Sequence, residues 1–441
     1  MHLNRQQFDR TTKRFGIVFA VMICLVVGRE ARAGFTPGQT YDKSNAQELT
    51  DILPESIMRW LTEDQYIMKT GEIKDWVHDP KLLALSKENE GKFDIDQDGN
   101  LVYKKEGKPP VFFMGMPFPT IDTNDPQAGT KIIQNMFSSR YYYEGSGGSC
   151  GILYWLGKNG GPERTVVSGV VNLFYWNRRQ GQIPNPNGFV SQRLNYVTEP
   201  MEVKGTTMMA WSYWNAREDA AFAYVPAIRR VRRTSAASRS DPFLGGEGTV
   251  DDVSGFDGKP SSMKWRLLGE KKILAPVVTT ATVTYPVHAD GSYTKIFDTP
   301  VVLGFMDKNF KGPSYAPLSL VWVPRQVYIV EMLPKDRYYN YSKEVIYVDK
   351  QNGLILLKDM YDRAGEFWKN GMNPNKKTVL STGERVMAMP SMDMYLDWRA
   401  RHAMVIVVGQ GSGAITQDGN LPLGKVGPKF FTEANMKQIS K

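Results

Sequence analysis

The stretch VIYVDKQNGLILL, residues 345–357, decides the fold class of this 441-residue chain. Residues 345–348 and 354–357 are rich in β-branched and aliphatic side chains, which favour strands. The segment between them ends in Asn352-Gly353, a pair that strongly predicts a tight turn between antiparallel strands. We therefore predict a β-hairpin at the centre of residues 341–365.

The same pattern continues along most of the chain after residue 141. Runs dominated by β-branched and aromatic residues occupy 165–176, 277–287, 318–333 and 403–408. Sequences that form turns, such as Asp290-Gly291, separate these runs. Many strands with intervening turns predict a mainly β fold built on an antiparallel sheet or barrel.

Few helices are expected, and they precede this region. Apolar residues at helical spacing predict helices over 55–69 and 126–139, the second with Asp125 as its cap. Residues 92–112 are predicted to form a hairpin that turns at 98–100. This hairpin begins with three alternating aspartates, as a calcium loop does, but Lys105 stands where such a loop needs a bidentate glutamate. A turn is therefore favoured over a calcium site.

The N-terminus carries the three-part pattern of a secretory signal. Four Lys or Arg residues precede position 15, residues 15–27 are apolar apart from one glycine, and Ala31-Arg32-Ala33 supplies small residues for cleavage. The apolar run is shorter than the roughly 20 residues that span a bilayer. We expect a cleavable signal peptide over 1–33 and a mature chain outside the cytoplasmic membrane.

The bulk composition excludes several classes of protein. Residues 1–33 hold six of the 55 Lys/Arg and two of the 46 Asp/Glu, so the mature chain has 49 against 44 and is only mildly basic. Nucleic acid is therefore not an expected partner. Cys150 would be the only remaining thiol, which allows no internal disulfide, and three scattered histidines give no metal site. No cofactor is expected.

Two short motifs resemble catalytic or cofactor sites without their usual context. Residues 147–151 match G-x-S-x-G, which would make Ser149 the nucleophile of an exported esterase, but a poor helix follows. Residues 409–414 match a dinucleotide fingerprint, yet Asp418-Gly419 and Pro422 break the helix that the pyrophosphate would need. A glycine-rich connection is favoured for both.

The sharpest charge cluster is Arg229, Arg230, Arg232 and Arg233. In a strand, Arg229 and Arg233 would share one face, and Arg230 and Arg232 the other. One interpretation is a solvated strand edge, where charges prevent aggregation. The other is the capture of phosphate or carboxylate head groups, or of a partner, because guanidinium groups match such anions.

Methionine and aromatic residues are abundant and clustered, with 21 Met, 10 Trp, 21 Tyr and 20 Phe. Such side chains suit an adaptable apolar cavity, although ordinary core packing is the more common role. The candidates that we single out for a lipid cavity are Met208, Trp211, Tyr213, Trp214 and Trp265.

Several blocks resemble the bacterial family named domain of unknown function 1329, often labelled outer-membrane lipoprotein-sorting protein, which belongs with LolA/LolB-like carriers. The blocks are GMPFP at 115–119, YVPAIRRVRR at 224–233, DDVSGFDG at 251–258, KWRLLG at 264–269, RQVYIVE at 325–331 and YDRAG at 361–365. Residues 34–80 depart from the usual start of the family.

The resemblance implies an incomplete antiparallel β-barrel, a LolA/LolB-like half-barrel over 111–441, closed by a few lid helices. Residues 34–110 would form an N-terminal extension with a short helix and a hairpin. The implied function is a non-enzymatic periplasmic carrier of lipid, lipoprotein or another lipophile, and the implied locations are the periplasm and the periphery of the outer membrane. An inner-membrane exporter of the resistance-nodulation-division (RND) type and an outer-membrane acceptor would be partners. Two alternatives stay open, namely an adaptor subunit of an export complex and the esterase using Ser149.

Overall fold

The computed structural model describes residues 35–214, 217–234, 239–387, 390–411 and 413–441. The predicted signal peptide over 1–33 lies outside the described residues. Within the described ranges, no helix has the length and apolar character needed to cross a bilayer.

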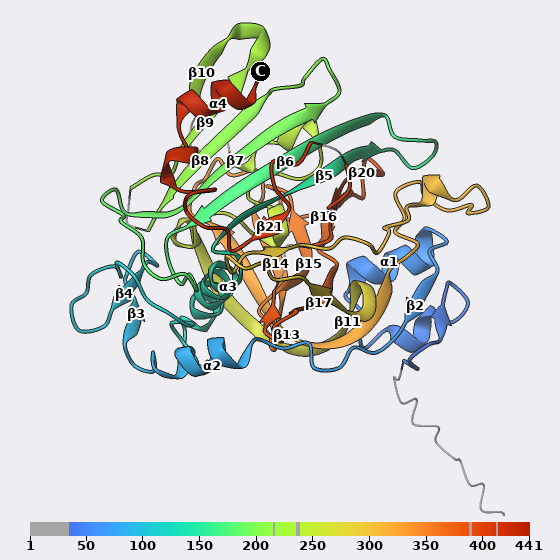
Figure 1. The fold of residues 1–441 in the computed structure, drawn as a ribbon. Helices are drawn as coiled ribbons and strands as arrows, with labels where there is room; N and C mark the ends of the chain where they lie inside the picture. Colours follow the sequence, from blue (N-terminus) through green and yellow to red (C-terminus); the bar gives the residue numbers. More distant parts are fainter. Residues whose placement is uncertain (1–34, 215–216, 235–238, 388–389, 412) are drawn as a thin grey trace, which may run out of the picture.

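One large sheet dominates the described chain (Figure 1). Its strands are β1 (Thr40–Tyr41), β2 (Met68–Thr70), β5 (Ser146–Leu156), β6 (Arg164–Phe174), β7 (Phe189–Glu199), β8 (Thr207–Tyr213), β9 (Ala220–Val225), β10 (Arg230–Thr234), β11 (Met263–Tyr285), β13 (Val321–Pro334), β14 (Lys343–Asp349), β15 (Ile355–Tyr361), β16 (Phe367–Met372), β17 (Asn375–Leu380), β18 (Arg385–Val386), β19 (Met392–Asp397) and β20 (His402–Val408). Two small pairs accompany it, β3 (Phe93–Ile95) with β4 (Leu101–Tyr103), and β12 (Tyr293–Thr294) with β21 (Asp418–Gly419).

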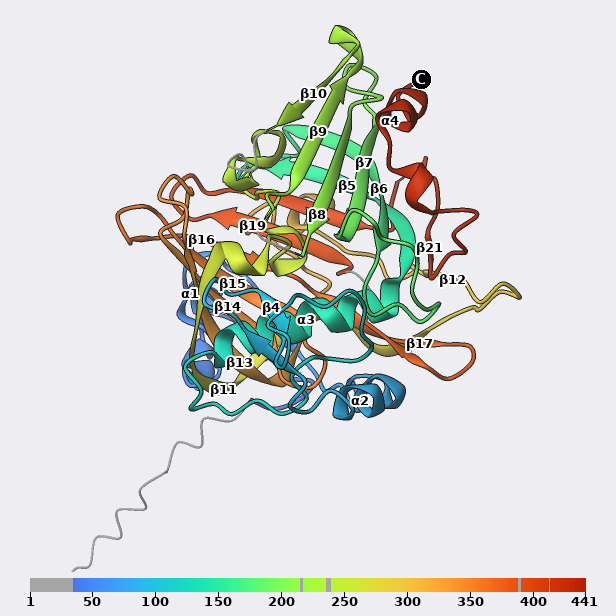
Figure 2. The same ribbon diagram turned by 90° about the vertical axis from the view of Figure 1, so that its left-hand side faces the viewer.

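The long run of the sheet is antiparallel, in the order β10-β9-β8-β7-β6-β5-β20-β19-β16-β15-β14-β13-β11. The second half of β11 pairs in parallel with β17, and β2 pairs in parallel with β13. Among the described strands β10 pairs only with β9, so the curved sheet does not close into a barrel (Figures 1 and 2). The predicted mainly β, incomplete antiparallel architecture is confirmed.

The central hairpin forms where the sequence predicts it, as β14 and β15. Gly353 adopts φ 72°, a left-handed conformation that favours glycine over residues with a Cβ. The Asp349 carboxylate accepts hydrogen bonds from the backbone N–H groups of Gln351 and Asn352 inside the turn, at 2.8 and 3.2 Å. The hairpin of β3 and β4 also forms as predicted, in place of a calcium loop.

Four α-helices lie among the described residues, α1 (Glu55–Glu63), α2 (Pro80–Lys87), α3 (Ala128–Glu144) and α4 (Glu433–Ile439). α1 starts where predicted but ends early, because Met68 joins strand β2. α3 begins two residues later than predicted and continues through Tyr141–Tyr143, which strand propensity had favoured as β. Burial decides here, since Tyr141 packs in one core cluster while Tyr142 and Tyr143 pack in another.

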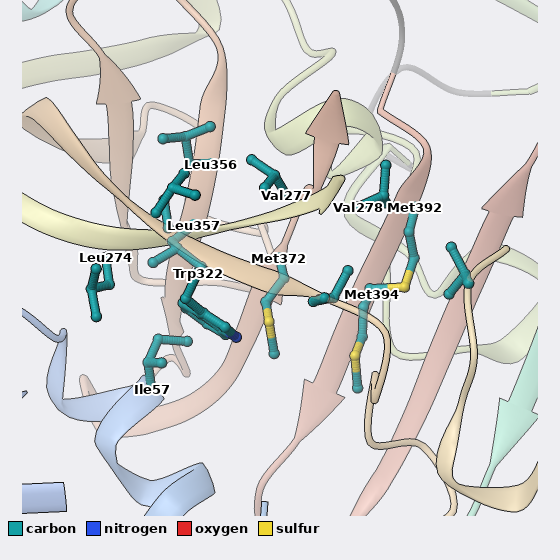
Figure 3. Packing of buried hydrophobic residues seen from close by; sticks show 14 of the residues in the cluster. Ile57, Leu274, Val277, Val278, Trp322, Leu356, Leu357, Met372, Met392 and Met394 are labelled. Carbon is teal, nitrogen blue, oxygen red and sulfur yellow. The ribbon is translucent and has the colours of Figure 1, made fainter. Parts of the chain in front are cut away.

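The sheet has two differently covered faces. We call the face that contacts α3 and the loop 251–258 the inner face, and the opposite one the outer face. On the outer face, α1 covers an apolar layer in which Ile57 faces Trp322, with Met372 and Met394 beside them (Figure 3). Residues 40–82 thus belong to the same core as the C-terminal strands.

Candidate functional site

α3 lies against the inner face, between the β5–β10 part of the sheet and β11 (Figures 1 and 2). Its start approaches β11 closely, because Gly129 has no side chain and a Cβ there would lie 2.9 Å from the carbonyl carbon of Trp265. Its end is fixed by the buried ion pair of Glu144 and Lys295, 2.6 Å apart. Gly145 terminates the helix with φ 59°.

One cavity, which we call the aromatic cavity, lies on one side of α3 and measures about 50 Å³. Phe137 and Tyr141 of α3 line it, opposite Trp176, Tyr213 and Trp214. Leu101 of the β3–β4 hairpin and Lys259 also border it. The indole N–H of Trp176 has no hydrogen-bond partner among the described residues. The lining therefore combines large aromatic surface with a smaller number of polar side chains.

A second cavity, the asparagine cavity, lies on the other side of α3 and measures about 30 Å³. Its apolar lining includes Met136 of α3, Ile355 and Met387, and its polar lining includes Asn352 and Asn373. Asn352 Oδ1 accepts from Leu354 N at 3.0 Å, and Asn373 Nδ2 donates to Asp393 at 2.6 Å, which fixes the orientation of both amides. The remaining atoms, Asn352 Nδ2 and Asn373 Oδ1, have no partner in the described chain. Among the described residues, the cavity lining thus includes unpaired donors, at Asn352 Nδ2 and Arg140 Nε, and an unpaired acceptor at Asn373 Oδ1.

Buried charges occupy the space between the two halves of the sheet, around the loop 251–258. Asp252 pairs with Lys358 of β15, which also pairs with Glu344 of β14, and all three side chains are fully buried. Asp257 pairs with Arg193 of β7 and with Arg140 of α3. This block, recognised in the sequence as DDVSGFDG, is therefore a connector between strands and helix.

The electrostatics of this region follow from burial and from the nearby guanidinium groups. Burial raises the pKa of Asp257, but Arg193, Arg140 and Arg239 outweigh it and hold that pKa below its usual value. Asp393, behind the asparagine cavity, has no such cation among its main influences, and burial raises its pKa to about 6. The interior beside α3 therefore contains a carboxyl group that gains a proton just below neutral pH.

The five predicted cavity residues fall in different places. Tyr213 and Trp214 line the aromatic cavity. Trp211 packs between the rings of Phe189 and Phe222, with ring centroids 5.8 and 4.8 Å away. Met208 is half-buried on the opposite face of β8, while its neighbour Met209 is the methionine in the core cluster.

Trp265 braces the start of α3 without lining either cavity. Its indole N–H donates to the Pro260 carbonyl at 2.8 Å, and its ring meets Phe256 edge-on at 4.9 Å. The sequence reasoning missed Phe137, Tyr141 and the asparagines. Asn373 and Asn375, two residues apart in an asparagine-rich stretch, were the available signal for the polar cavity.

The four arginines lie exposed at the edge of the sheet, and none of them lines either cavity. Residues 224–233 are a hairpin and not one strand, since a turn over Pro226–Ile228 separates β9 from β10. Arg229 lies in this turn with φ 49°. The prediction that Arg229 and Arg233 share one strand face is therefore wrong. Arg230 and Arg232 do share one face of β10.

The catalytic and cofactor motifs do not have the structural context that their chemistry needs. Residues 147–151 lie inside strand β5, paired with β6, and Ser149 is 1% exposed, whereas a nucleophile elbow needs a sharp turn into a helix. The described residues after β20 form no helix before Pro428. Within the described residues, no three His, Cys, Asp or Glu side chains are grouped to hold a metal ion.

A model of the family described as Protein of unknown function (DUF1329) matches residues 40–437. The chain belongs to this DUF1329 family. The match includes residues 40–80, a segment that departs from the usual start of the family. An uncharacterized protein of Pseudomonas aeruginosa is 25% identical over 177 residues, which is 39% of this chain and 35% of that protein. The match therefore spans about a third of the length of that relative.

Solved structures similar to this DUF1329 protein share little sequence with it. A putative outer membrane lipoprotein-sorting protein domain from Vibrio parahaemolyticus is 16% identical with a TM-score of 0.45, and covers 71% of this chain and 100% of its own. A DUF1329 family protein from Desulfovibrio piger is 17% identical with a TM-score of 0.46, at the same coverage. A LolA superfamily protein from Nitrosomonas europaea is 13% identical with a TM-score of 0.41, covering 69% and 98%. Identities this low leave the ligand to be inferred from the geometry.

Proposed function

We propose that this DUF1329 protein binds a lipophilic molecule between α3 and the inner face of the sheet, and carries it outside the cytoplasmic membrane without chemical change. The observation that carries the proposal is the pair of cavities on opposite sides of one buried helix. A single displacement of α3 would join them into one continuous space.

The aromatic cavity supplies the apolar surface that such a ligand needs. Burial of each methylene of an acyl chain is favourable by about 0.8 kcal/mol, so a chain of ordinary length crosses water only inside a carrier. Phe137, Tyr141, Trp176 and Tyr213 offer ring faces, and none of them is more than slightly exposed. Their large, rigid contact area suits a hydrocarbon chain.

The asparagine cavity supplies a polar end. Asn352 Nδ2 can donate to a carbonyl oxygen of the ligand, and Asn373 Oδ1 can accept from a hydroxyl or amide N–H. Burying these groups without partners is costly, by about 1–3 kcal/mol each, so a ligand that satisfies both gains affinity and orientation. An acyl chain linked to an amide or hydroxyl group has the matching chemistry.

Binding requires α3 to move, because the two cavities together hold only a few water-sized groups. The C-terminal end of α3 is pinned by Glu144 and by the Tyr143 carbonyl, which accepts from Tyr293 Oη at 2.8 Å. The Asn135 side chain ties the earlier part to the backbone of Phe118, at 2.7 and 3.0 Å. We infer that the helix pivots about its pinned end and opens at its start.

A disulfide across the asparagine cavity tests this motion. A Cβ at Gly353 would lie 3.5 Å from Ser139 Oγ, so side chains at these two positions are in contact across the cavity. The Ser139→Cys/Gly353→Cys variant should take up a fluorescent fatty amide when reduced, and should lose most of that uptake when oxidised. Lipid retained from the cell, identified by native mass spectrometry, should follow the same pattern.

Single variants Ser139→Cys and Gly353→Cys control for the strain that a side chain at φ 72° introduces. Both should bind the probe equally well with and without reductant. Equal uptake by the oxidised and reduced double variant would contradict the motion of α3. No uptake by the unmodified protein, together with no lipid in its mass spectrum, would contradict the carrier function itself.

The cellular setting is part of the same proposal. A secretory signal over residues 1–33 would deliver the protein to the periplasm, where an RND-type exporter could supply cargo and an outer-membrane acceptor could receive it. Crosslinking in cells at an exposed surface position, followed by mass spectrometry of the product, tests these partners. Crosslinks to cytoplasmic proteins alone would contradict the proposed location.

A further inference from the structure

Two neighbouring hairpins end side by side at one end of the sheet. Thr207 pairs with Tyr196 on one side and with Tyr224 on the other, so the turn over 200–206 and the turn over 226–229 lie next to each other. Gly205 marks the contact, since a Cβ there would lie 3.2 Å from Pro226 Cγ. We call these two turns the hairpin tips. Both views place the end of the β9–β10 hairpin at the far margin of the molecule from α3 (Figures 1 and 2).

The hairpin tips expose large apolar side chains. Met201 is 77% exposed, the most of any large hydrophobic residue in the described chain, and Ile228 and Val225 are 45% and 38% exposed. Turns usually carry polar residues at such positions, because apolar side chains gain nothing from contact with water. Met201 and Ile228 on the adjacent turns, with Val225 at the end of β9, form a patch, and an exposed apolar patch indicates a surface that is covered in use.

Basic side chains surround this patch. Residues 197–206 and 224–234 hold five Lys/Arg against two Glu. Arg229, Arg230, Arg232 and Arg233 are all exposed, and none forms an ion pair with a described carboxylate. Lys204 is exposed in the other turn. Positive charge without local compensation predicts an anionic counterpart.

We propose that the hairpin tips dock on an anionic membrane surface, with Met201, Val225 and Ile228 entering the interface and the arginines contacting lipid phosphates. This surface is independent of the cavities beside α3, and its function does not require a bound lipophile. Apolar side chains at the tip, surrounded by basic side chains, match the boundary between the acyl chains and the phosphates of a membrane. The uncompensated positive charge beside exposed apolar side chains is what favours an anionic lipid surface as the occupant.

The spacing of the side chains agrees with this geometry. Strand residues advance about 3.4 Å each, so Arg230 and Arg232 lie roughly 3 and 10 Å behind Arg229 at the end of the turn. The head-group layer of one leaflet is about 5–8 Å thick. With the tip residues at the edge of the hydrocarbon, the β10 guanidinium groups therefore reach the depth of the phosphates.

Vesicle flotation tests the proposal. The protein should float with phosphatidylcholine vesicles that contain about one third phosphatidylglycerol, and much less with pure phosphatidylcholine. About 0.5 M NaCl should reduce the bound fraction, because the screening length falls to a few ångströms. The Arg230→Gln/Arg232→Gln variant should weaken binding roughly tenfold or more. The Met201→Ser/Val225→Ser/Ile228→Ser variant should weaken it comparably and leave the salt dependence in place.

Matched variants elsewhere on the surface serve as controls. Lys104→Gln/Lys105→Gln removes two exposed charges near the β3–β4 hairpin, and Val111→Ser/Leu83→Ser removes two exposed apolar side chains. Both should bind vesicles as the unmodified protein does. Absence of flotation would overturn the proposal and leave the hairpin tips to a protein partner. Equal losses in the tip variants and the controls would overturn it as well.

A site-specific probe tests the same contact without relying on the correct folding of variants that carry several substitutions. An environment-sensitive dye attached to Met201→Cys should shift to the blue and become protected from aqueous quenchers when anionic vesicles are added. The same dye on Val111→Cys should do neither. Cys150, the one thiol expected in the chain after removal of residues 1–33, is buried and should not compete for label. An unchanged spectrum at position 201 in vesicle-bound protein would place the contact elsewhere and reject the hairpin tips.

Discussion

His78 shows how burial sets the behaviour of a single residue. Its ring stacks on Tyr143 with centroids 6.2 Å apart, and burial lowers its pKa from 6.5 to about 4. The unfolded chain gains a proton near pH 6.5, while the folded chain resists protonation until about pH 4. His78 therefore contributes stability that is complete above pH 6.5 and is lost as the pH falls towards 4.

Replacement of this imidazole should reduce the acid sensitivity of the fold. Between about pH 7.5 and about pH 4.5, the free energy of unfolding of His78→Gln should fall by roughly 2–3 kcal/mol less than that of the unmodified protein. Urea unfolding at the two pH values measures the difference. His288→Gln, at an exposed position, controls for the loss of an imidazole as such. Parallel pH profiles for His78→Gln and the unmodified protein would show that His78 is protonated in the fold.

Individual side chains were harder to place from the sequence than strands were. The alternation typical of a strand was evident in residues 207–214. Which of the two alternating sets of side chains faces the core was not. Tyr213 reaches the aromatic cavity, whereas Met208 faces the other way and Met209 takes the core position. Phase depends on what covers each face, and here the cover comes from α3 and the C-terminal segment, distant in sequence.

At the scale of elements, α3 depends on a close approach that only glycine permits. A Cβ on Gly129 would lie 2.9–3.0 Å from backbone atoms of Trp265 and Arg266, which cannot move without disturbing β11. Gly129→Ala gains about 1 kcal/mol of helix propensity. Overpacking against backbone costs about 1–3 kcal/mol, so we expect a net loss of stability of about 1 kcal/mol.

Thermal unfolding and uptake of the fatty amide probe would both report this change. Because the added methyl group pushes the start of α3 away from β11, Gly129→Ala should lower the melting temperature yet speed the entry of the probe. Gly161→Ala, with open space around the new methyl group, should change neither by much. A Gly129→Ala protein as stable as the unmodified one would mean that β11 yields to the helix.

The elements themselves were largely predictable, and their lengths were not. The Asn-Gly turn and the β-branched runs fixed the β14–β15 hairpin, β6 and β20, because their signals are local. α3 extends past its predicted end since its last tyrosines are buried on several sides, which overrides their strand propensity. The asparagine cavity joins α3, a turn and β16–β17 residues that only the tertiary fold brings together.

At the scale of the whole molecule, the loop 251–258 connects parts that are far apart in the chain. Asp252 bonds with β15, Asp257 bonds with β7 and α3, and Tyr395 Oη of β19 donates to the Asp252 carbonyl at 2.6 Å. The family block at 251–258 marked this loop in the sequence. Its partners could not be predicted, because buried ion pairs that are 64 to 117 residues apart leave no periodic pattern.

Replacement of Lys358 should weaken the connection that the loop 251–258 makes. Its ammonium group pairs with both Asp252 and Glu344, and all three side chains are fully buried, so Lys358→Met would remove the cation that the two carboxylates share. Removing one partner of such a cluster costs about 3–5 kcal/mol, whereas removing all the charges together is often neutral. In urea, Lys358→Met should lose that stability, and Lys358→Met/Asp252→Asn/Glu344→Gln should regain most of it.

The exposed Lys104→Met is the control for loss of a lysine, and it should unfold as the unmodified protein does. The shape of the transition carries further information, because the loop joins β7 to β14 and β15 across the interior. If this link makes the two halves unfold as one unit, tryptophan fluorescence and circular dichroism should coincide for the unmodified protein and separate for Lys358→Met. If the two transitions coincide in Lys358→Met and its stability is unchanged, the ion pairs do not hold the sheet together. The continuous backbone pairing of the strands would then do so alone.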